Sequence, residues 1–296
     1  MKADASTLEA FVLDAGDTGH RLCLYHAPPR PGTERAVLLH VPAFAEEMNK
    51  TRRMVAMTSR ALAADGVAVL TTDLYGCGDS AGDFGDARWD HWLDDLHRAH
   101  AWLRRRSTAP LWLWSCRAGA LLADAFAQRL DERVNHLLWQ PVLQGKAVVQ
   151  QLLRLKAAAS WASGDGKAQL EQARNDLAAG RSIEVAGYRL SSELAAALEG
   201  ARFGPPPDGR GDPGRIAWLE IGASQAPAEL SPAAATAMAP WRRAGWSVQA
   251  QAVVGPSFWQ TVEVEEAPEL MAATVNALRL SCSEAPAVLR KEAATP

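Results

Sequence analysis

The second half of the chain lacks histidine. The seven histidines are His20, His26, His40, His91, His97, His100 and His136, and residues 137–296 contain none. Histidine is the side chain that most often serves as a general base near neutral pH. A catalytic site of this protein must therefore take an imidazole base from the first half of the chain or work without one.

Cysteine is also scarce. The four cysteines are Cys23, Cys77, Cys116 and Cys282, and no two of them stand in a CxxC spacing. The spacing indicates neither a disulfide framework nor a zinc site, and it predicts reduced thiols in a cytoplasmic protein. We expect neither a metal nor a cofactor.

Long apolar runs and an excess of charge are absent too. The chain has no stretch of 18 apolar residues, and its first ten residues, MKADASTLEA, lack the apolar run of a signal peptide. A formal net charge of −3 gives no overall positive field that would collect nucleic acid. The sequence therefore predicts neither a membrane span nor a nucleic-acid partner.

Apolar runs of strand length alternate with amphipathic stretches of helix length along most of the 296 residues. Strands are expected near 10–14, 21–26, 36–41, 67–73, 111–115, 135–140, 215–221 and 247–254. Helices are expected over 51–64, 89–106, 119–130, 231–244 and 268–279. A tight turn at Gly16 predicts an antiparallel hairpin of the first two strands, and Asn49 or Thr51 is a natural cap for the first helix. The pattern predicts the α/β class, a mostly parallel sheet with helices on both faces.

The alternation breaks over residues 145–205. This stretch is alanine-rich and helical in character, is interrupted by Gly164, Gly166 and Gly180, and ends in a proline run. We therefore predict one core formed by residues 1–144 and 206–282, with a helical cap inserted at 145–205. Residues 283–296 are expected to form a disordered tail.

Four segments of the core carry a resemblance to a known family. They read PAFAEEMNK at 42–50, DLYGCGDS at 73–80, GDARWD at 85–90 and GPSFW at 255–259. Over roughly residues 10–280 the chain resembles the second of the α/β-hydrolases associated with exosortase A systems, which are encoded beside exopolysaccharide and PEP-CTERM protein-sorting genes in Gram-negative bacteria. The resemblance implies a three-layer α/β/α hydrolase fold, an ester or thioester substrate, and partner proteins of those systems.

A hydrolase of this fold carries its nucleophile on a sharp strand-to-helix turn, the nucleophile elbow. The residues two before and two after the tip must be small, because strand and helix nearly touch there. In LWLWSCRAGA at 111–120, one register puts Arg117 at the tip with Ser115 and Gly119 as its flanks. The other puts Cys116 at the tip and Trp114 where glycine is usual. Steric fit favours Arg117, which cannot be deprotonated and is therefore no nucleophile.

Cys116 is nevertheless the best candidate nucleophile, because a helix N-terminus and a neighbouring arginine lower the pKa of a thiol. His40 is its candidate base. In the alternative interpretation Cys116 is a small buried residue and His40 holds the neighbouring loop by a hydrogen bond. The literal G-x-S-x-G match at 78–82 lies in a loop, so the hydroxyl of Ser80 is expected to bond to the local backbone.

The acid and histidine positions of the superfamily also differ from the usual pattern. The loop after the strand at 215–221 reads GASQ at 222–225, without the usual aspartate. After the last strand, where the superfamily has its histidine, stand Ser257, Phe258 and Trp259. We expect these three residues either to line a pocket or to pack in the core or against the cap. All three triad positions thus lack their usual chemistry.

An electrostatic site remains at the elbow. The residues expected to form an oxyanion or anion-binding site are Phe44, Ala45, Arg117 and Ala118. Backbone N–H groups at a helix N-terminus together with a guanidinium suit a carboxylate or a phosphate. In the alternative interpretation Arg117 turns back to pair with Glu46 or Glu47 and fastens two loops; Glu46 is also expected in the pocket.

Two classes of function follow. The resemblance favours a hydrolase of an ester, thioester or similar acyl substrate. The degenerate triad favours a catalytically silent homologue that binds a small anionic or acyl metabolite, or a partner protein, in the same cleft.

Overall fold

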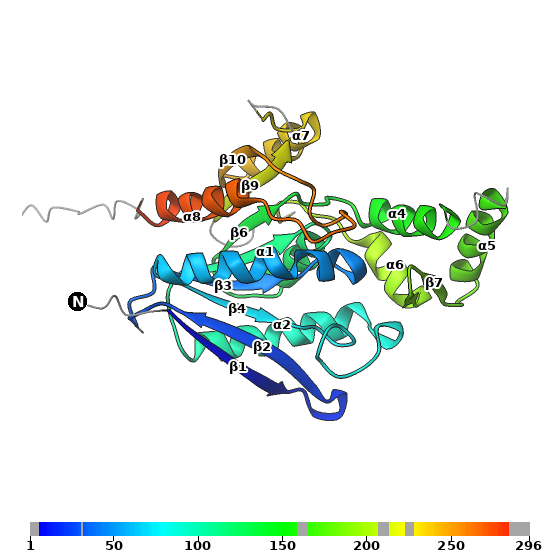
Figure 1. The fold of residues 1–296 in the computed structure, drawn as a ribbon, viewed down its shortest axis with the longest axis horizontal. Helices are drawn as coiled ribbons and strands as arrows, with labels where there is room; N and C mark the ends of the chain where they lie inside the picture. Colours follow the sequence, from blue (N-terminus) through cyan, green and yellow to red (C-terminus); the bar gives the residue numbers. More distant parts are fainter. Residues whose placement is uncertain (1–5, 31, 159–164, 207–212, 223–227, 284–296) are drawn as a thin grey trace, which may run out of the picture.

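The computed structural model describes residues 6–30, 32–158, 165–206, 213–222 and 228–283. Its main sheet has the strands β1 (Thr7–Asp14), β2 (His20–Ala27), β3 (Ala36–Val41), β4 (Val67–Thr72), β5 (Leu111–Cys116), β6 (Val134–Trp139), β9 (Arg215–Gly222) and β10 (Ser247–Val254). Their order across the sheet is β1-β2-β4-β3-β5-β6-β9-β10 (Figure 1). β2 is antiparallel to β1 and to β4, whereas all other neighbours are parallel. The predicted α/β class and the N-terminal hairpin are confirmed.

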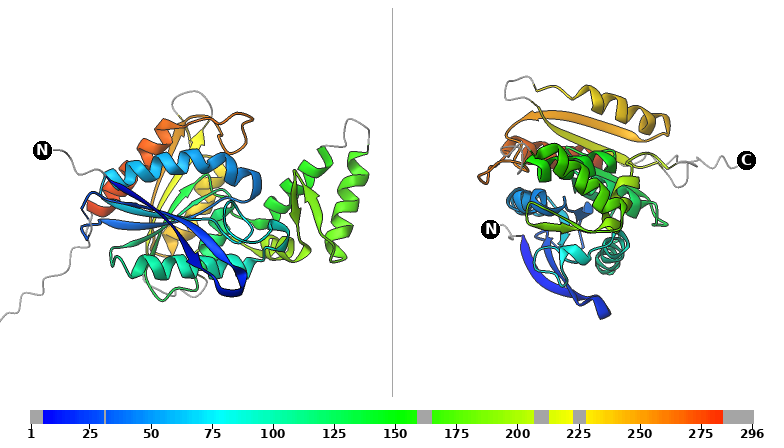
Figure 2. Two further views of the ribbon diagram at one scale, coloured as in Figure 1. Left: turned by 60° about the horizontal axis from the view of Figure 1, so that its bottom comes forward. Right: turned by 90° about the vertical axis from the view of Figure 1, so that its right-hand side faces the viewer.

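Helices cover both faces of this sheet (Figure 2). One face packs against α1 (Ala45–Ala64) and α8 (Pro268–Ser283), and the other against α2 (Trp89–Arg104), α3 (Gly119–Ala127) and α7 (Pro232–Arg243). Successive strand residues point to opposite faces, so Leu38 belongs to the first layer and Leu39 to the second. All six residues of β3 are buried, as expected for a central parallel strand.

The first helix begins earlier than the sequence predicts. α1 starts at Ala45 instead of residue 51, and neither predicted cap residue caps it. Asn49 donates to the hydroxyl of Tyr188 (2.7 Å), and Thr51 donates to the carbonyl of Met48 (2.9 Å). The helix instead has two glutamates in its first turn, where negative charge interacts favourably with the helix dipole. Its N-terminus therefore reaches the carboxyl end of the sheet.

The chain between β6 and β9 forms a separate group of elements: α4 (Gly145–Ala158), α5 (Gly166–Ala178), the hairpin β7 (Ile183–Val185) and β8 (Tyr188–Leu190), and α6 (Ser192–Gly200). Hereafter called the insertion, it lies beyond the carboxyl ends of the parallel strands (Figures 1 and 2). The N–H of Gly145 donates to the carbonyl of Ala201 (2.9 Å), so the chain leaves and rejoins the core at one place. It occupies the segment predicted as a cap, but its β-hairpin has no counterpart in the prediction. Of the tail predicted at 283–296, Ser283 is the last residue of α8 and the rest lies outside the described residues.

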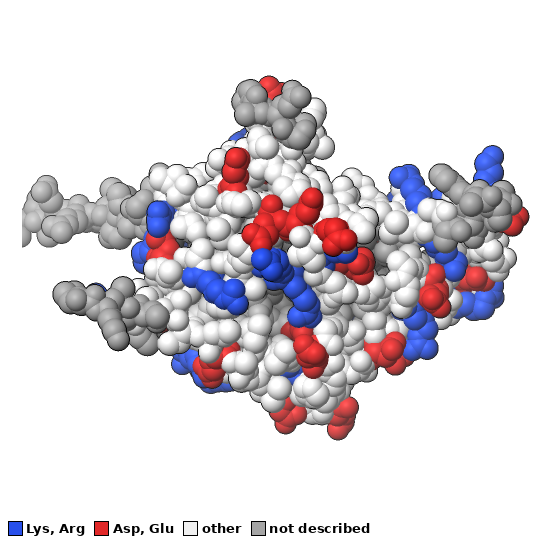
Figure 3. Space-filling model, viewed as in Figure 1, with Lys and Arg blue, Asp and Glu red and all other residues white. Residues whose placement is uncertain are grey.

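Exposed ion pairs join the insertion to the core. Arg189 of β8 pairs with Asp86 (3.1 Å), and Arg88 pairs with Glu193 of α6. On the face in Figure 3 acidic and basic side chains lie close together. Arg53 of α1 also pairs with Glu266 (2.5 Å). Such pairs are each worth up to about 1 kcal/mol. Among the described residues no helix combines the length and apolarity needed to cross a membrane.

Candidate functional site

The turn between β5 and α3 has the geometry of an elbow. Arg117 stands in it with a φ of 54°, in the left-handed region that residues other than glycine seldom adopt. A Cβ added to Gly119 would lie 2.4 Å from the carbonyl oxygen of Pro42, so no larger residue fits there without a shift. Ser115, on the other flank, is completely buried. The residue at the tip is therefore Arg117.

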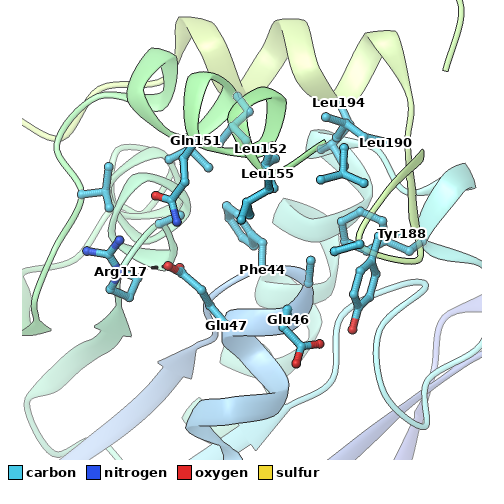
Figure 4. A pocket seen from close by; sticks show the side chains of 18 of the residues that line it. Phe44, Glu46, Glu47, Arg117, Gln151, Leu152, Leu155, Tyr188, Leu190 and Leu194 are labelled. Carbon is cyan, nitrogen blue, oxygen red and sulfur yellow. Dashed lines mark hydrogen bonds and ion pairs between the residues drawn. The ribbon is translucent and has the colours of Figure 1, made fainter. Parts of the chain in front are cut away.

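A pocket opens at this elbow, between the core and the insertion (Figure 4). The core contributes Phe44 and Arg117, and the insertion contributes Leu152, Leu155 and Leu194. Its volume is about 70 Å³, and most of its lining is apolar. Since one water molecule needs roughly 10–15 Å³ measured in this way, the space accepts a chain of several methylene groups.

Backbone strain gathers around the same pocket. In the described residues four positions other than glycine have a positive φ, and three of them line the pocket: Ala45 (52°), Arg117 (54°) and Ala186 (49°). Each such conformation costs about 1–3 kcal/mol and persists only where its surroundings fix it. This concentration of strained residues marks the pocket as the candidate functional site.

Arg117 is held at the inner end of the pocket by Glu47. Its Nε donates to Oε1 of Glu47 at 3.1 Å, and the two side chains are 16% and 20% exposed. The ring of Trp259 lies 5.3 Å from the guanidinium carbon, close enough for a cation–π contact. The sequence left open whether Arg117 faces the cleft or pairs with a glutamate, and the structure shows both at once.

Cys116 lies in the core instead of the pocket. It ends β5, is completely buried, and packs in the layer under α1 and α8. Burial raises the pKa of its thiol, and the nearby carboxylate of Glu47 adds to the rise. A catalytic thiolate needs a lowered pKa and some exposure. The structure thus gives Cys116 a packing role and no support as a nucleophile.

His40 is not placed as a base either. Its ring packs edge-on against Trp114, with centroids 4.9 Å apart, and it lines a second cavity under α1. Burial, together with the charge of Arg52, lowers the pKa of the imidazole to about 3. Its Nε2 has no hydrogen-bond partner among the described residues.

The other imidazoles do not line the elbow pocket either. All seven histidines belong to the described part of the chain, and none of them lines the pocket at Arg117. In that part of the chain no cluster of three or more histidine, cysteine, aspartate or glutamate side chains could hold a metal ion. The described lining of the pocket therefore contains no imidazole base.

The position at which the superfamily has its histidine carries packed residues. Phe258 and Trp259 are buried in the layer under α1 and α8, and Ser257 is half-buried. None of these three lines the pocket at Arg117; Phe258 and Trp259 pack in the core, and the ring of Trp259 also contacts the guanidinium of Arg117. Residues 223–225 of the predicted acid loop lie outside the described residues. Glu220, at the end of β9, accepts from the backbone N–H of Ser231 (2.8 Å) and fixes the start of α7.

Ser80 fastens a loop. Its Oγ donates to the carbonyl of Asp73 (2.6 Å) and accepts from the N–H of Leu22 (2.9 Å). Both bonds involve backbone groups, as the position of the serine outside a strand-turn-helix context predicts. The literal G-x-S-x-G match therefore carries no nucleophile.

The structure brings five predicted residues together in the pocket: Phe44, Ala45, Glu46, Arg117 and Ala118. The prediction missed the side supplied by the insertion, including Gln151 and Tyr188. A signal for it exists, because Val148, Leu152 and Leu155 are spaced four and three residues apart and share one face of α4. That face lines the pocket, which leaves Leu155 half exposed.

Comparison with known proteins identifies the fold. No protein-family model matches the chain, and no curated protein is significantly similar to it in sequence. Among solved structures it is similar to a thermostable carboxyl esterase from Bacillus coagulans (TM-score 0.61, 13% identity, 93% of this chain and 99% of the esterase). It is also similar to a proline iminopeptidase from Mycobacterium smegmatis (0.54, 15%, 93% and 99%) and a lidless α/β serine hydrolase from Xanthomonas campestris (0.51, 16%, 94% and 94%). The chain has the α/β-hydrolase fold.

Proposed function

We propose that this protein is a non-hydrolytic member of the α/β-hydrolase fold that binds an acyl chain between its core and its insertion. The observation that carries the proposal is Arg117 at the tip of the elbow. The nucleophile of a hydrolase stands at that position, and a guanidinium cannot take its place. A side chain with several N–H donors there serves binding instead.

The neighbouring residues support this choice over the hydrolase that the family resemblance implies. Ser115 and Cys116 are both completely buried, so neither presents an oxygen or a sulfur to a ligand in the pocket. Without an imidazole at the pocket, a serine or cysteine would also lack the base that activates it. The hydrolase reading therefore needs a nucleophile that the elbow does not supply.

The shape and polarity of the pocket support an acyl ligand. Phe44, Leu152 and Leu194 form apolar walls, while Arg117 and Gln151 stand at one end. Such a pocket fits a molecule with a short hydrocarbon tail and one polar head, because the tail gains from leaving water and the head keeps its hydrogen bonds. Following the family resemblance, we assign this ligand to exopolysaccharide or PEP-CTERM handling in the cytoplasm, where partner proteins of those systems would receive it.

The proposal is tested by measuring binding and turnover on the same sample. p-Nitrophenyl octanoate and octanoyl-CoA should show no hydrolysis above that of a Cys116→Ala variant, and a fluorophosphonate should label no serine. Octanamide, an eight-carbon acyl compound that resists hydrolysis far more than an ester does, should bind one molecule per chain by calorimetry. Stoichiometric labelling of Ser80 or Ser115, or turnover that Cys116→Ala removes, contradicts the proposal.

A further inference from the structure

The charge of Arg117 at the end of the pocket is already neutralised before any ligand enters. The positive charge of Arg117 lies 3.1 Å from the carboxylate of Glu47, within a partly buried pair. The second carboxylate on the pocket lining, that of Glu46, lies 3.7 Å from the ammonium of Lys50. A ligand carboxylate placed at Arg117 would therefore bring a second negative charge beside Glu47, and like charges in a partly desolvated site repel each other.

Arg117 and Glu47, in contrast, still have donors and acceptors that make no hydrogen bond. Only Nε of Arg117 bonds to Glu47, so the two terminal nitrogens of the guanidinium have no partner among the described residues. Oε2 of Glu47 likewise has none. Gln151 of α4 extends its amide toward this pair in Figure 4 and adds another donor and acceptor. Donors and acceptors thus face the same small space.

We propose that the acyl ligand of this pocket carries an uncharged head that both donates and accepts hydrogen bonds, such as a primary amide, and that Glu47 excludes free carboxylates. The inference rests on the proposed function and names its ligand class. The carbonyl oxygen of such a head accepts from the terminal nitrogens of Arg117, and its N–H group donates to Oε2 of Glu47. This inference departs from the sequence-based expectation of an anion site, because Glu47 already neutralises Arg117.

The test compares octanamide with octanoate, two probes with the same tail and different heads, by calorimetry at pH 8. The wild-type protein should bind octanamide at least about tenfold more tightly than octanoate, because one head repels Glu47 and the other does not. Glu47→Gln keeps the shape of the side chain and removes its charge, so octanoate should gain about tenfold and the preference for octanamide should shrink by the same factor. Glu193→Gln removes the same charge from an Arg–Glu pair outside the pocket and should leave the ratio unchanged.

The outcomes separate the inference from the function it rests on. Octanoate binding to wild type as tightly as octanamide, or a ratio that Glu47→Gln does not shift, overturns the inference while leaving the acyl-binding function in place. Binding of neither probe to a wild-type protein that unfolds cooperatively overturns both. Equal shifts in Glu47→Gln and Glu193→Gln show a general charge effect and also overturn the inference.

Discussion

Two arginine–carboxylate pairs of this protein differ in what remains unbonded. Arg21 of β2 lies beside Asp95 of α2, with Nε 2.6 Å from Oδ1 and each side chain 2% exposed. Its terminal nitrogens donate to Thr18 and to the carbonyl of His20, and Oδ2 of Asp95 accepts from the N–H of Tyr75 (2.7 Å). All three guanidinium nitrogens of Arg21 are bonded, which identifies this pair as a structural fastener between the N-terminal hairpin, the loop after β4 and α2.

The pair of Arg117 and Glu47 uses one hydrogen bond and leaves the rest of the guanidinium facing a cavity. A satisfied buried ion pair holds a fold in one arrangement, whereas a partly satisfied pair at a pocket is available to a ligand. The comparison therefore predicts that replacing Arg21 mainly lowers the stability of the fold, whereas replacing Arg117 mainly weakens ligand binding.

The largest effect is expected from Arg21→Met. It leaves the carboxylate of Asp95 buried without its cation, and breaking a buried pair in this way costs roughly 3–5 kcal/mol of unfolding free energy. Urea unfolding measures the loss. Arg53→Met is the matched control, because Arg53 is mostly exposed in its pair with Glu266 and should cost less than about 1 kcal/mol. Equal losses in the two variants would remove the distinction between the pairs.

A third carboxyl sharpens the comparison because it is buried without a cation. Burial raises the pKa of Asp124 from 3.8 to about 7, while hydrogen bonds from Gln128 and from the N–H of Gly204 oppose the rise. The folded protein thus keeps this proton up to about pH 7, whereas the unfolded chain loses it near pH 4. The contribution of Asp124 is greatest below pH 4 and is lost as the pH rises to 7, on the order of 4 kcal/mol.

Asp124→Asn should remove that loss. Subtracting its unfolding free energy from that of the wild type, at steps between pH 4 and 8, isolates the carboxyl from all other titrating groups. This difference, wild type minus variant, should fall as the pH rises from 4 to 7 and should be constant above pH 7. A difference that is the same at every pH would show that Asp124 is ionised in the folded protein.

The smallest effect on stability is expected from Arg117→Met. The pair is less buried than that of Arg21 and faces a cavity, so the loss of unfolding free energy should be smaller than the roughly 3–5 kcal/mol expected for Arg21→Met. Octanamide should bind about tenfold more weakly, since a charge-assisted hydrogen bond contributes roughly 1.5 kcal/mol. Arg129→Met, in an exposed pair with Asp90 outside the pocket, should alter neither quantity. A large loss of stability with unchanged binding would make Arg117 a fastener like Arg21.

The sheet could be predicted closely because its signal is local. Each strand of the main sheet lies within three residues of its expected start, since apolar runs bounded by turns are written in consecutive residues. The elbow tip at Arg117 could also be predicted from the sequence, because the small residues that the turn requires, Ser115 and Gly119, lie in the same short segment. The start of α1 was not, since a local capping signal at Asn49 competed with contacts to the insertion.

The composition of the pocket depends on contacts between distant segments, which the sequence alone does not supply. From the sequence, Glu46 and Glu47 were equally good partners for Arg117. Only the helix geometry of α1 selects Glu47. The sequence also did not decide whether Trp259 lines the pocket or packs in the core. That choice depends on the layer under α1 and α8, which is assembled from both ends of the chain.

A crystal structure of the protein with octanamide tests the central claim most directly. We predict the carbonyl oxygen of the amide within hydrogen-bond distance of a terminal nitrogen of Arg117, its N–H group facing Glu47, and the tail between Phe44 and Leu152. Octanamide bound in the cavity beside His40, or in the elbow pocket with its head turned away from Arg117, would contradict the claim that the elbow tip has become a binding group.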